Sequence, residues 1–101
     1  MLTSKQRSIL RSMGNELEPI LIVGKGGITA NTIEQLDQAL SARELVKGRV
    51  LPHTEWDTRE TASELAEATG ADVVQVIGRN ILFYRPPETG RSPRIDLSGE
   101  G

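Results

Sequence analysis

Residues 19–29 of the chain read Pro-Ile-Leu-Ile-Val-Gly-Lys-Gly-Gly-Ile-Thr, and they contain the most informative local signals of the sequence. The four apolar residues after Pro19 have the length of a strand. A continuous run of this kind is typical of a strand that is buried on both faces or lies centrally in a sheet. The glycine-rich segment 24–27 ends the run, and Thr29 or Asn31 is placed to cap a following helix. A strand, a glycine loop and a helix start therefore follow one another directly.

The segments around this stretch alternate between helix and strand patterns. Thr3 and Gln6 have the spacing of a capping box, as do Asp57 and Glu60, and Gly70 is suited to a left-handed helix end. The predicted elements are a helix to about Met13 that stops at Gly14-Asn15, a strand over 20–23, a helix with Ile33, Leu36 and Leu40 on its buried side, a strand over 45–51, a helix from Asp57 to Gly70, and strands over 73–77 and 81–85.

This order predicts an α/β fold of the α-β-α-β-α-β-β type. We expect a single two-layer domain over residues 1–86, with helices packed on a four-stranded mixed sheet. The sheet should be largely parallel with one antiparallel partner, because the short turn Gly78-Arg79-Asn80 suits a hairpin. Residues 87–101 are rich in proline and glycine and poor in apolar side chains, so we expect a flexible tail.

Composition limits the classes of function. The 101 residues contain no cysteine, which excludes disulfides, a thiol nucleophile and a thiolate metal site. No apolar run approaches the roughly 20 residues of a membrane helix, and the N-terminus lacks the apolar centre of a secretory signal. We therefore expect a cytoplasmic protein without membrane contact.

The formal net charge is −2, but the charges are segregated along the chain. The acids lie mainly in the predicted second and third helices. The bases lie mainly in the first helix, the glycine loop and the strands: Lys5, Arg7, Arg11, Lys25, Lys47, Arg49, Arg79 and Arg85. Such segregation can produce one basic face on an acidic protein, although charges that simply coat solvated surfaces would give the same counts.

The glycine loop has the chemistry of a phosphate contact. Backbone N–H groups of glycine can approach a phosphate closely, the following helix start adds partial positive charge, and Lys25 adds a full charge. The P-loop pattern fails because Gly26 follows Lys25, and the dinucleotide pattern fails because Thr29 stands where glycine is required. A GxxG loop of the kind that clamps a nucleotide backbone in KH modules remains, beside the alternative that the glycines only make a tight turn.

Other candidate sites are weaker. His53 is the only histidine and has no partner at metal-ligand or nucleophile spacing, so a metal or catalytic site is not expected. Glu60, Glu64 and Glu67 share a helix face, which a solvated surface explains best. The three aromatic residues cannot form a stacking platform on one sheet. Trp56 is expected to fold over the start of the third helix, and at most one of Phe83 and Tyr84 to be buried.

Several motifs together resemble the CRM domain family, in particular its stand-alone bacterial YhbY-type members. These motifs are residues 19–29, the Thr-Arg-Glu-Thr helix start at 58–61, and the stretches 69–79 and 82–86. The resemblance implies a fold similar to the C-terminal domain of translation initiation factor three. It implies RNA binding by Gly24, Lys25, Gly26 and Gly27 and by a basic first helix with Lys5, Arg7 and Arg11. It also implies association with large ribosomal subunit precursors, as plant members are associated with group II intron splicing.

Together these observations predict an RNA-binding factor for large-subunit assembly, monomeric and without catalysis, cofactor, metal or small-molecule substrate. Lys47, Arg49 and Arg79 complete the predicted RNA-binding set. One alternative is a protein-interaction module that is recruited to the ribosome through its acidic third helix. A second alternative, a small phosphate-ligand enzyme, lacks a general base and metal ligands in the sequence.

Overall fold

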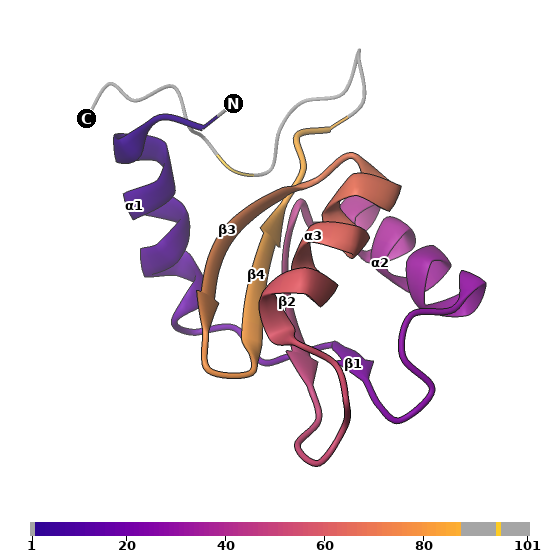
Figure 1. The fold of residues 1–101 in the computed structure, drawn as a ribbon. Helices are drawn as coiled ribbons and strands as arrows, with labels where there is room; N and C mark the ends of the chain where they lie inside the picture. The colour runs from indigo at the N-terminus through magenta and orange to yellow at the C-terminus, as the bar shows by residue number, and fades with distance from the viewer. Residues whose placement is uncertain (1, 88–94, 96–101) are drawn as a thin grey trace.

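Helices and strands alternate along the chain in the predicted order (Figure 1). The computed structural model describes residues 2–87 and residue 95. Within them the elements are α1 (Ser4–Gly14), β1 (Leu21–Val23), α2 (Ala30–Arg43), β2 (Leu45–Val50), α3 (Thr58–Thr69), β3 (Asp72–Ile77) and β4 (Asn80–Tyr84). None of these helices is long and apolar enough to cross a membrane.

The sheet has the strand order β1-β2-β4-β3. β1 pairs with β2 in parallel, and β4 pairs antiparallel with both β2 and β3. Three strands thus share one direction and β4 opposes them, as the sequence predicts. Because β4 lies between β2 and β3, however, only the β1–β2 pairing is parallel.

β1 lies at an edge of the sheet, so the prediction of a strand buried on both faces or in the centre is wrong. Leu21 and Val23 face the core, but Ile22 between them is 49% exposed. Both faces of this short strand carry apolar side chains. Leu21 and Val23 enter the core, whereas Ile20 and Ile22 lie on a part of the sheet that no helix covers.

The helices lie on both faces of the sheet, which gives three layers where the sequence predicted two (Figure 1). α2 and α3 cover one face and share a core with Val46, Val50 and Phe83. α1 covers part of the other face, where Leu10 packs with Leu45, Leu82 and Tyr84. Neighbouring residues of β4 therefore enter different cores. Phe83 and Tyr84 are both buried, contrary to the expectation of one at most.

The helix ends follow the predicted local chemistry. Thr3 and Gln6 form the capping box of α1, and Thr29 caps α2. The Asp57 carboxylate accepts the Glu60 N–H at 2.9 Å, but the Glu60 side chain does not return the bond, so only half of the predicted capping box forms. Gly70 ends α3 with φ 75°. α1 ends at Gly14 with Asn15 as its cap, as predicted. Gly14 also lets α1 approach β4 closely, because a Cβ there would lie 2.5 Å from Leu82 Cδ2.

Most of the predicted flexible tail lies outside the described residues, but Ile95 is an exception. Its side chain is 8% exposed and packs with Leu10 and Tyr84 in the core under α1. Its N–H donates to Glu44 Oε1 at 3.3 Å. At this one position the segment has apolar surface to bury, which the composition of the tail did not indicate.

Arg85, directly after β4, joins the C-terminal halves of α2 and α3. Its Nη1 donates to Asp37 Oδ1 at 2.6 Å and to the Thr69 carbonyl at 2.8 Å. Its Nη2 donates to the Asp37 carbonyl at 3.0 Å and to Ser41 Oγ at 2.9 Å. Arg85 is therefore a structural residue, although sequence alone groups it with the other bases.

Replacing Arg85 with lysine should lower the free energy of unfolding by about 1–2 kcal/mol. Lysine keeps the charge near Asp37 but cannot reproduce the fork of charged hydrogen bonds, and partial exposure of the ion pair limits the loss. Urea denaturation followed by circular dichroism measures the change. Arg43→Lys, on the exposed last turn of α2, is the control and should be nearly neutral. Equal stability of both variants would contradict this function of Arg85.

Candidate nucleic-acid interface

Three connecting segments meet at one edge of the sheet. β1, β2 and β3 run in the same direction, so the glycine loop, the β2–α3 loop (residues 51–57) and the β3–β4 turn (Gly78-Arg79) all follow carboxyl ends at this edge (Figure 1). We name this end of the sheet, where β1, β2 and β3 terminate, the carboxyl edge. In open α/β sheets, ligands bind in crevices outside such ends.

The glycine loop is a tight turn with an exposed tip. The Gly27 N–H donates to the Gly24 carbonyl at 3.0 Å, and Lys25 and Gly26 project between them into solvent. Gly27 has φ 69°, a left-handed conformation that favours glycine. Thr32 Oγ1 donates to the Gly27 carbonyl at 3.4 Å and so links the loop to the first turn of α2.

Trp56 holds this loop from the side. Its indole Nε1–H donates to the Gly24 carbonyl at 2.9 Å, and its ring covers Gly27, where a Cβ would lie 2.8 Å from Trp56 Cζ2. From the sequence, Trp56 is expected to fold over the start of α3. No local pattern indicates its contact with a loop 32 positions away.

The three loop glycines differ in what the fold requires of them. Gly27 needs its left-handed backbone and its missing Cβ. A Cβ at Gly26 would meet nothing within 4 Å, and one at Gly24 would make an ordinary contact with Leu51 at 3.6 Å. The tight-turn explanation therefore accounts for Gly27 alone. The fold does not require a glycine at position 26, and the absence of a side chain there leaves the backbone of the loop tip accessible.

Arg79 ties the β3–β4 turn to the same edge. The Val50 N–H donates to the Arg79 carbonyl at 2.9 Å, and Arg79 Nη1 lies 3.4 Å from the Leu51 carbonyl that it donates to. An open groove between the turn and the start of α3 is lined by Trp56, Asp57, Thr58, Gly78 and Arg79. Arg79, which belongs to the predicted RNA-binding set, therefore lies beside the β2–α3 loop at the carboxyl edge.

The basic residues of α1 lie elsewhere. α1 packs on β2, β3 and β4, away from the strand that leads into the glycine loop (Figure 1). Arg7 is half-buried and donates through Nη1 to the carbonyls of Val73 and Val74 at 3.0 and 3.2 Å. These carbonyls lie at a register shift in β3. Arg7 therefore attaches α1 to the sheet. Lys5 in the first turn and Arg11 in the last do not join the loop in one track.

Lys47 and Arg49 lie on the α1 side of β2, on the part of the sheet that α1 leaves open. Lys47 is half-buried and donates to the Leu17 carbonyl at 3.2 Å, whereas Arg49 is exposed. The structure thus brings together the glycine loop and Arg79, places Lys47 and Arg49 on the adjoining sheet surface, and separates Lys5, Arg7 and Arg11 from them.

The remaining polar candidates show no constellation for chemistry. His53, Glu60, Glu64 and Glu67 are exposed, and residues 2–87 and 95 contain no group of acidic or histidine side chains that could hold a metal ion. Burial under α1 raises the pKa of the Tyr84 hydroxyl above its ordinary value of 10.0, and the nearby Glu44 and Asp72 charges raise it further. Tyr84 therefore stays neutral in the core and offers no stacking surface.

The fold and its exposed glycine loop define a class of small α/β domains with a GxxG turn after the first strand. The CRS1 / YhbY (CRM) domain matches residues 2–85, and the chain belongs to this family. It is 42% identical to "Probable RNA-binding protein YqeI" of Bacillus subtilis, over 96% of this chain and 99% of that protein. It is 36% identical to "Probable RNA-binding protein PA4753" of Pseudomonas aeruginosa, over 83% and 81% of the two chains.

A solved structure has the same fold. The solution structure of the hypothetical protein SAV1595 from Staphylococcus aureus superposes with a TM-score of 0.76 and is 43% identical in sequence. The match covers 95% of this chain and all of that one. The similarity therefore extends over the whole described domain.

Gly27→Ala should lower the free energy of unfolding by about 1–2 kcal/mol, because a Cβ at φ 69° is strained and also meets Trp56. Gly26→Ala is the matched control one position earlier and should change stability by less than about 0.5 kcal/mol. Thermal and urea denaturation measure both. If Gly26→Ala destabilises the protein as much as Gly27→Ala, the division between the two glycines is wrong.

Proposed function

We propose that the chain binds RNA at the carboxyl edge and assists assembly of the large ribosomal subunit without catalysis. The observation that carries this proposal is the loop tip Lys25-Gly26. It is exposed, carries a positive charge, and keeps a glycine that neither the backbone conformation nor the packing requires.

A phosphate backbone is the ligand that best fits such a tip. An RNA phosphate can approach a loop without side-chain bulk closely enough to meet its N–H groups, and Lys25 supplies the countercharge. The start of α2 adds partial positive charge just behind the loop. Arg79 lies at the same edge and can contact a second phosphate.

The relatives support the same ligand. Two proteins similar over most of their length are named probable RNA-binding proteins. The large-subunit precursor as the particular RNA follows from the resemblance to YhbY-type proteins. We further propose that the protein acts as a monomer, because the contacts of the glycine loop all come from one chain. We also propose that it acts in the cytoplasm.

The proposal is tested by measuring the RNA affinity of a variant in which the loop tip is altered and the fold is kept. Lys25→Asp combined with Gly26→Asp should weaken binding to a fluorescent fragment of large-subunit ribosomal RNA at least tenfold, because it places two negative charges at the phosphate contact. The slope of log affinity against log salt should also fall by about 0.7–0.9 for each phosphate that the variant no longer neutralises. Fluorescence anisotropy measures both, and circular dichroism checks the fold.

Two controls separate this proposal from the protein-interaction alternative. Arg43→Gln removes an exposed charge at the opposite end of α2 and should leave affinity nearly unchanged. Glu64→Gln with Glu67→Gln changes the exposed face of α3 and should not weaken ribosome association. A folded Lys25→Asp/Gly26→Asp protein that binds RNA normally refutes the loop contact. Loss of ribosome association in the α3 variant, with normal RNA affinity, would favour recruitment by a protein.

A further inference from the structure

Two rows of side chains cross the sheet on the face that α1 covers only in part. The pairing Ile22–Arg49–Asn80–Ile77 forms the row next to the carboxyl edge. The second row consists of Lys47, its partner Leu82 and Gln75, with Ile20 beside them through its N–H bond to the Lys47 carbonyl at 2.9 Å. These eight residues are named the open rows. They alternate along their strands with residues of the core under α2 and α3.

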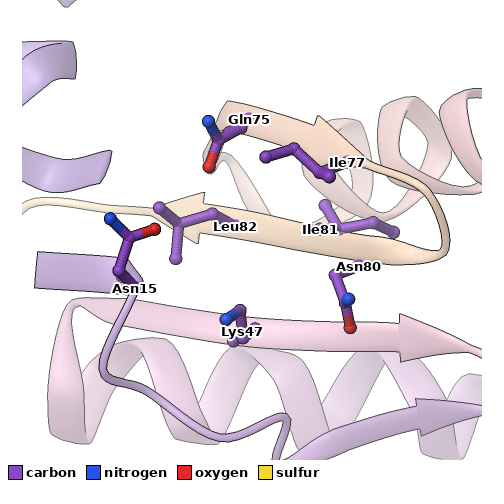
Figure 2. Close-up of a pocket in the computed structure, with 8 residues that line it drawn as sticks. Asn15, Lys47, Gln75, Ile77, Asn80, Ile81 and Leu82 are labelled. Carbon is purple, nitrogen blue, oxygen red and sulfur yellow. The ribbon is translucent and has the colours of Figure 1, made fainter. Parts of the chain in front are cut away.

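The open rows contain a small cavity beside the end of α1. Its volume is about 120 Å³. Figure 2 shows the side chains that surround it, with Asn15 at the end of α1, Gln75 on β3, Asn80 on β4 and Lys47 on β2. The side-chain amides of Asn15, Gln75 and Asn80 bond to no protein group within the part of the chain that the structure describes.

The size of the cavity restricts its ligand. Pockets for complete cofactors or drug-sized molecules have volumes of about 300–1,000 Å³, so this one is too small for them. The ligand of this cavity is therefore a small group, such as one ring of a larger molecule, and not a complete cofactor.

The chemistry of the lining selects a nucleobase. Each amide offers donors and an acceptor, the combination that pairs with the edge of a base. Ile77, which is 60% exposed, provides apolar contact for the face of a base, and the buried Leu82 lines the cavity beside it. Arg49 lies outside the lining but beside Asn80 on the neighbouring strand, where it offers a guanidinium plane and a charge for a phosphate. Lys47 has three donors, one of which reaches Leu17, so others remain for the ligand.

The charge of the open rows favours RNA over a protein partner. Two cations lie at the centre of the rows, and none of the eight residues is acidic. The eight residues include no aromatic side chain, the type enriched at the centres of protein interfaces, and they include a lysine, which is depleted there.

We propose that the cavity is a base-reading subsite for one unpaired nucleotide, in which Asn15, Gln75 and Asn80 contact the base edge while Lys47 and Arg49 contact the flanking phosphates. This inference rests on the proposed RNA-binding function. The two surfaces are continuous, because Ile22 lies two residues before Gly24 and Asn80 directly follows Arg79. Reading a base edge in RNA requires a single-stranded segment, since bases in helices are stacked and paired.

Single-base RNA octamers provide the test: oligo(A), oligo(C), oligo(G) and oligo(U), each titrated into the 101-residue chain. The wild type should distinguish the tightest from the weakest octamer by at least about fivefold, the discrimination expected of one good amide–base pair. In Asn80→Ala and Gln75→Ala this ratio should approach one, while the salt dependence of binding is retained. Gln35→Ala, an exposed amide on α2, is the matched control and should keep the ratio.

Nuclear magnetic resonance provides a second readout that is independent of affinity. In the ¹⁵N-labelled protein, the side-chain NH₂ signals of Asn15, Gln75 and Asn80 should shift on addition of the preferred octamer, and that of Gln35 should not. A ranking of octamers that is unchanged in the folded variants, or absent from the wild type, overturns the base-reading subsite. RNA binding itself is then intact, so the proposed function survives.

Other outcomes are equally distinct. If the wild type binds none of the octamers and no ribosomal RNA fragment, the proposed function fails together with this subsite. If Ile20→Ser with Ile22→Ser abolishes association with ribosomal particles but leaves the octamer ranking and NH₂ shifts at wild-type values, the subsite stands and these two exposed isoleucines contact a protein. If the same variant abolishes association and the amides do not shift, the open rows are a protein interface and the proposal is wrong.

Discussion

The insertion of β4 between β2 and β3 is the constraint on which the rest of the structure depends. Ile81 to Tyr84 are all buried, and their side chains alternate between the core under α2 and α3 and the core under α1. The same pairing sets the register that aligns Arg49 with Asn80 and Lys47 with Leu82. A shift of one residue would exchange the two faces and remove both cores as well as the open rows.

β4 also determines how the carboxyl edge is built. Because it opposes the other strands, the turn that precedes it lies beside the loops after β1 and β2. Arg79 is thereby fixed against Leu51, and Trp56 from the β2–α3 loop holds the glycine loop. The scaffold thus uses Gly27 and Trp56 to fix the turn and leaves Lys25 and Gly26 exposed. Rigid support beneath an exposed, charged tip reduces the entropy that binding would otherwise cost.

The sequence predicted those features that depend on local chemistry. The order of elements, the capping residues Thr3 and Asp57, the Gly70 helix end and the hairpin turn all follow from signals within a few residues. Features set by contacts between distant segments were missed. An apolar run such as 20–23 looks the same in a central strand and in an edge strand beside an uncovered surface. Likewise, the sequence cannot distinguish an arginine that contacts phosphate from one such as Arg7, whose guanidinium donates to a carbonyl of β3.

The sequence predicted the part of the candidate site that is contiguous in the chain and missed the part that comes from separate elements. The glycine loop was identified because its pattern is contiguous, whereas Trp56, Asn15, Gln75 and Asn80 come from separate elements and share no sequence pattern. The separation of α1 from the loop also could not be read, because nothing in the sequence indicates which face of the sheet a helix covers. The consequence is a smaller basic surface than the sequence suggested, centred on the carboxyl edge and not on α1.

Ultraviolet crosslinking followed by mass spectrometry would show whether RNA contacts the carboxyl edge. The 101-residue chain, bound to a fragment of large-subunit ribosomal RNA, would be irradiated, digested and searched for peptides that carry a nucleotide. RNA contact at the carboxyl edge should give crosslinks within residues 24–27 and 77–80, with fewer on the outer face of α3. Crosslinks confined to α3 or to the first turn of α1, with none at the glycine loop, would contradict it.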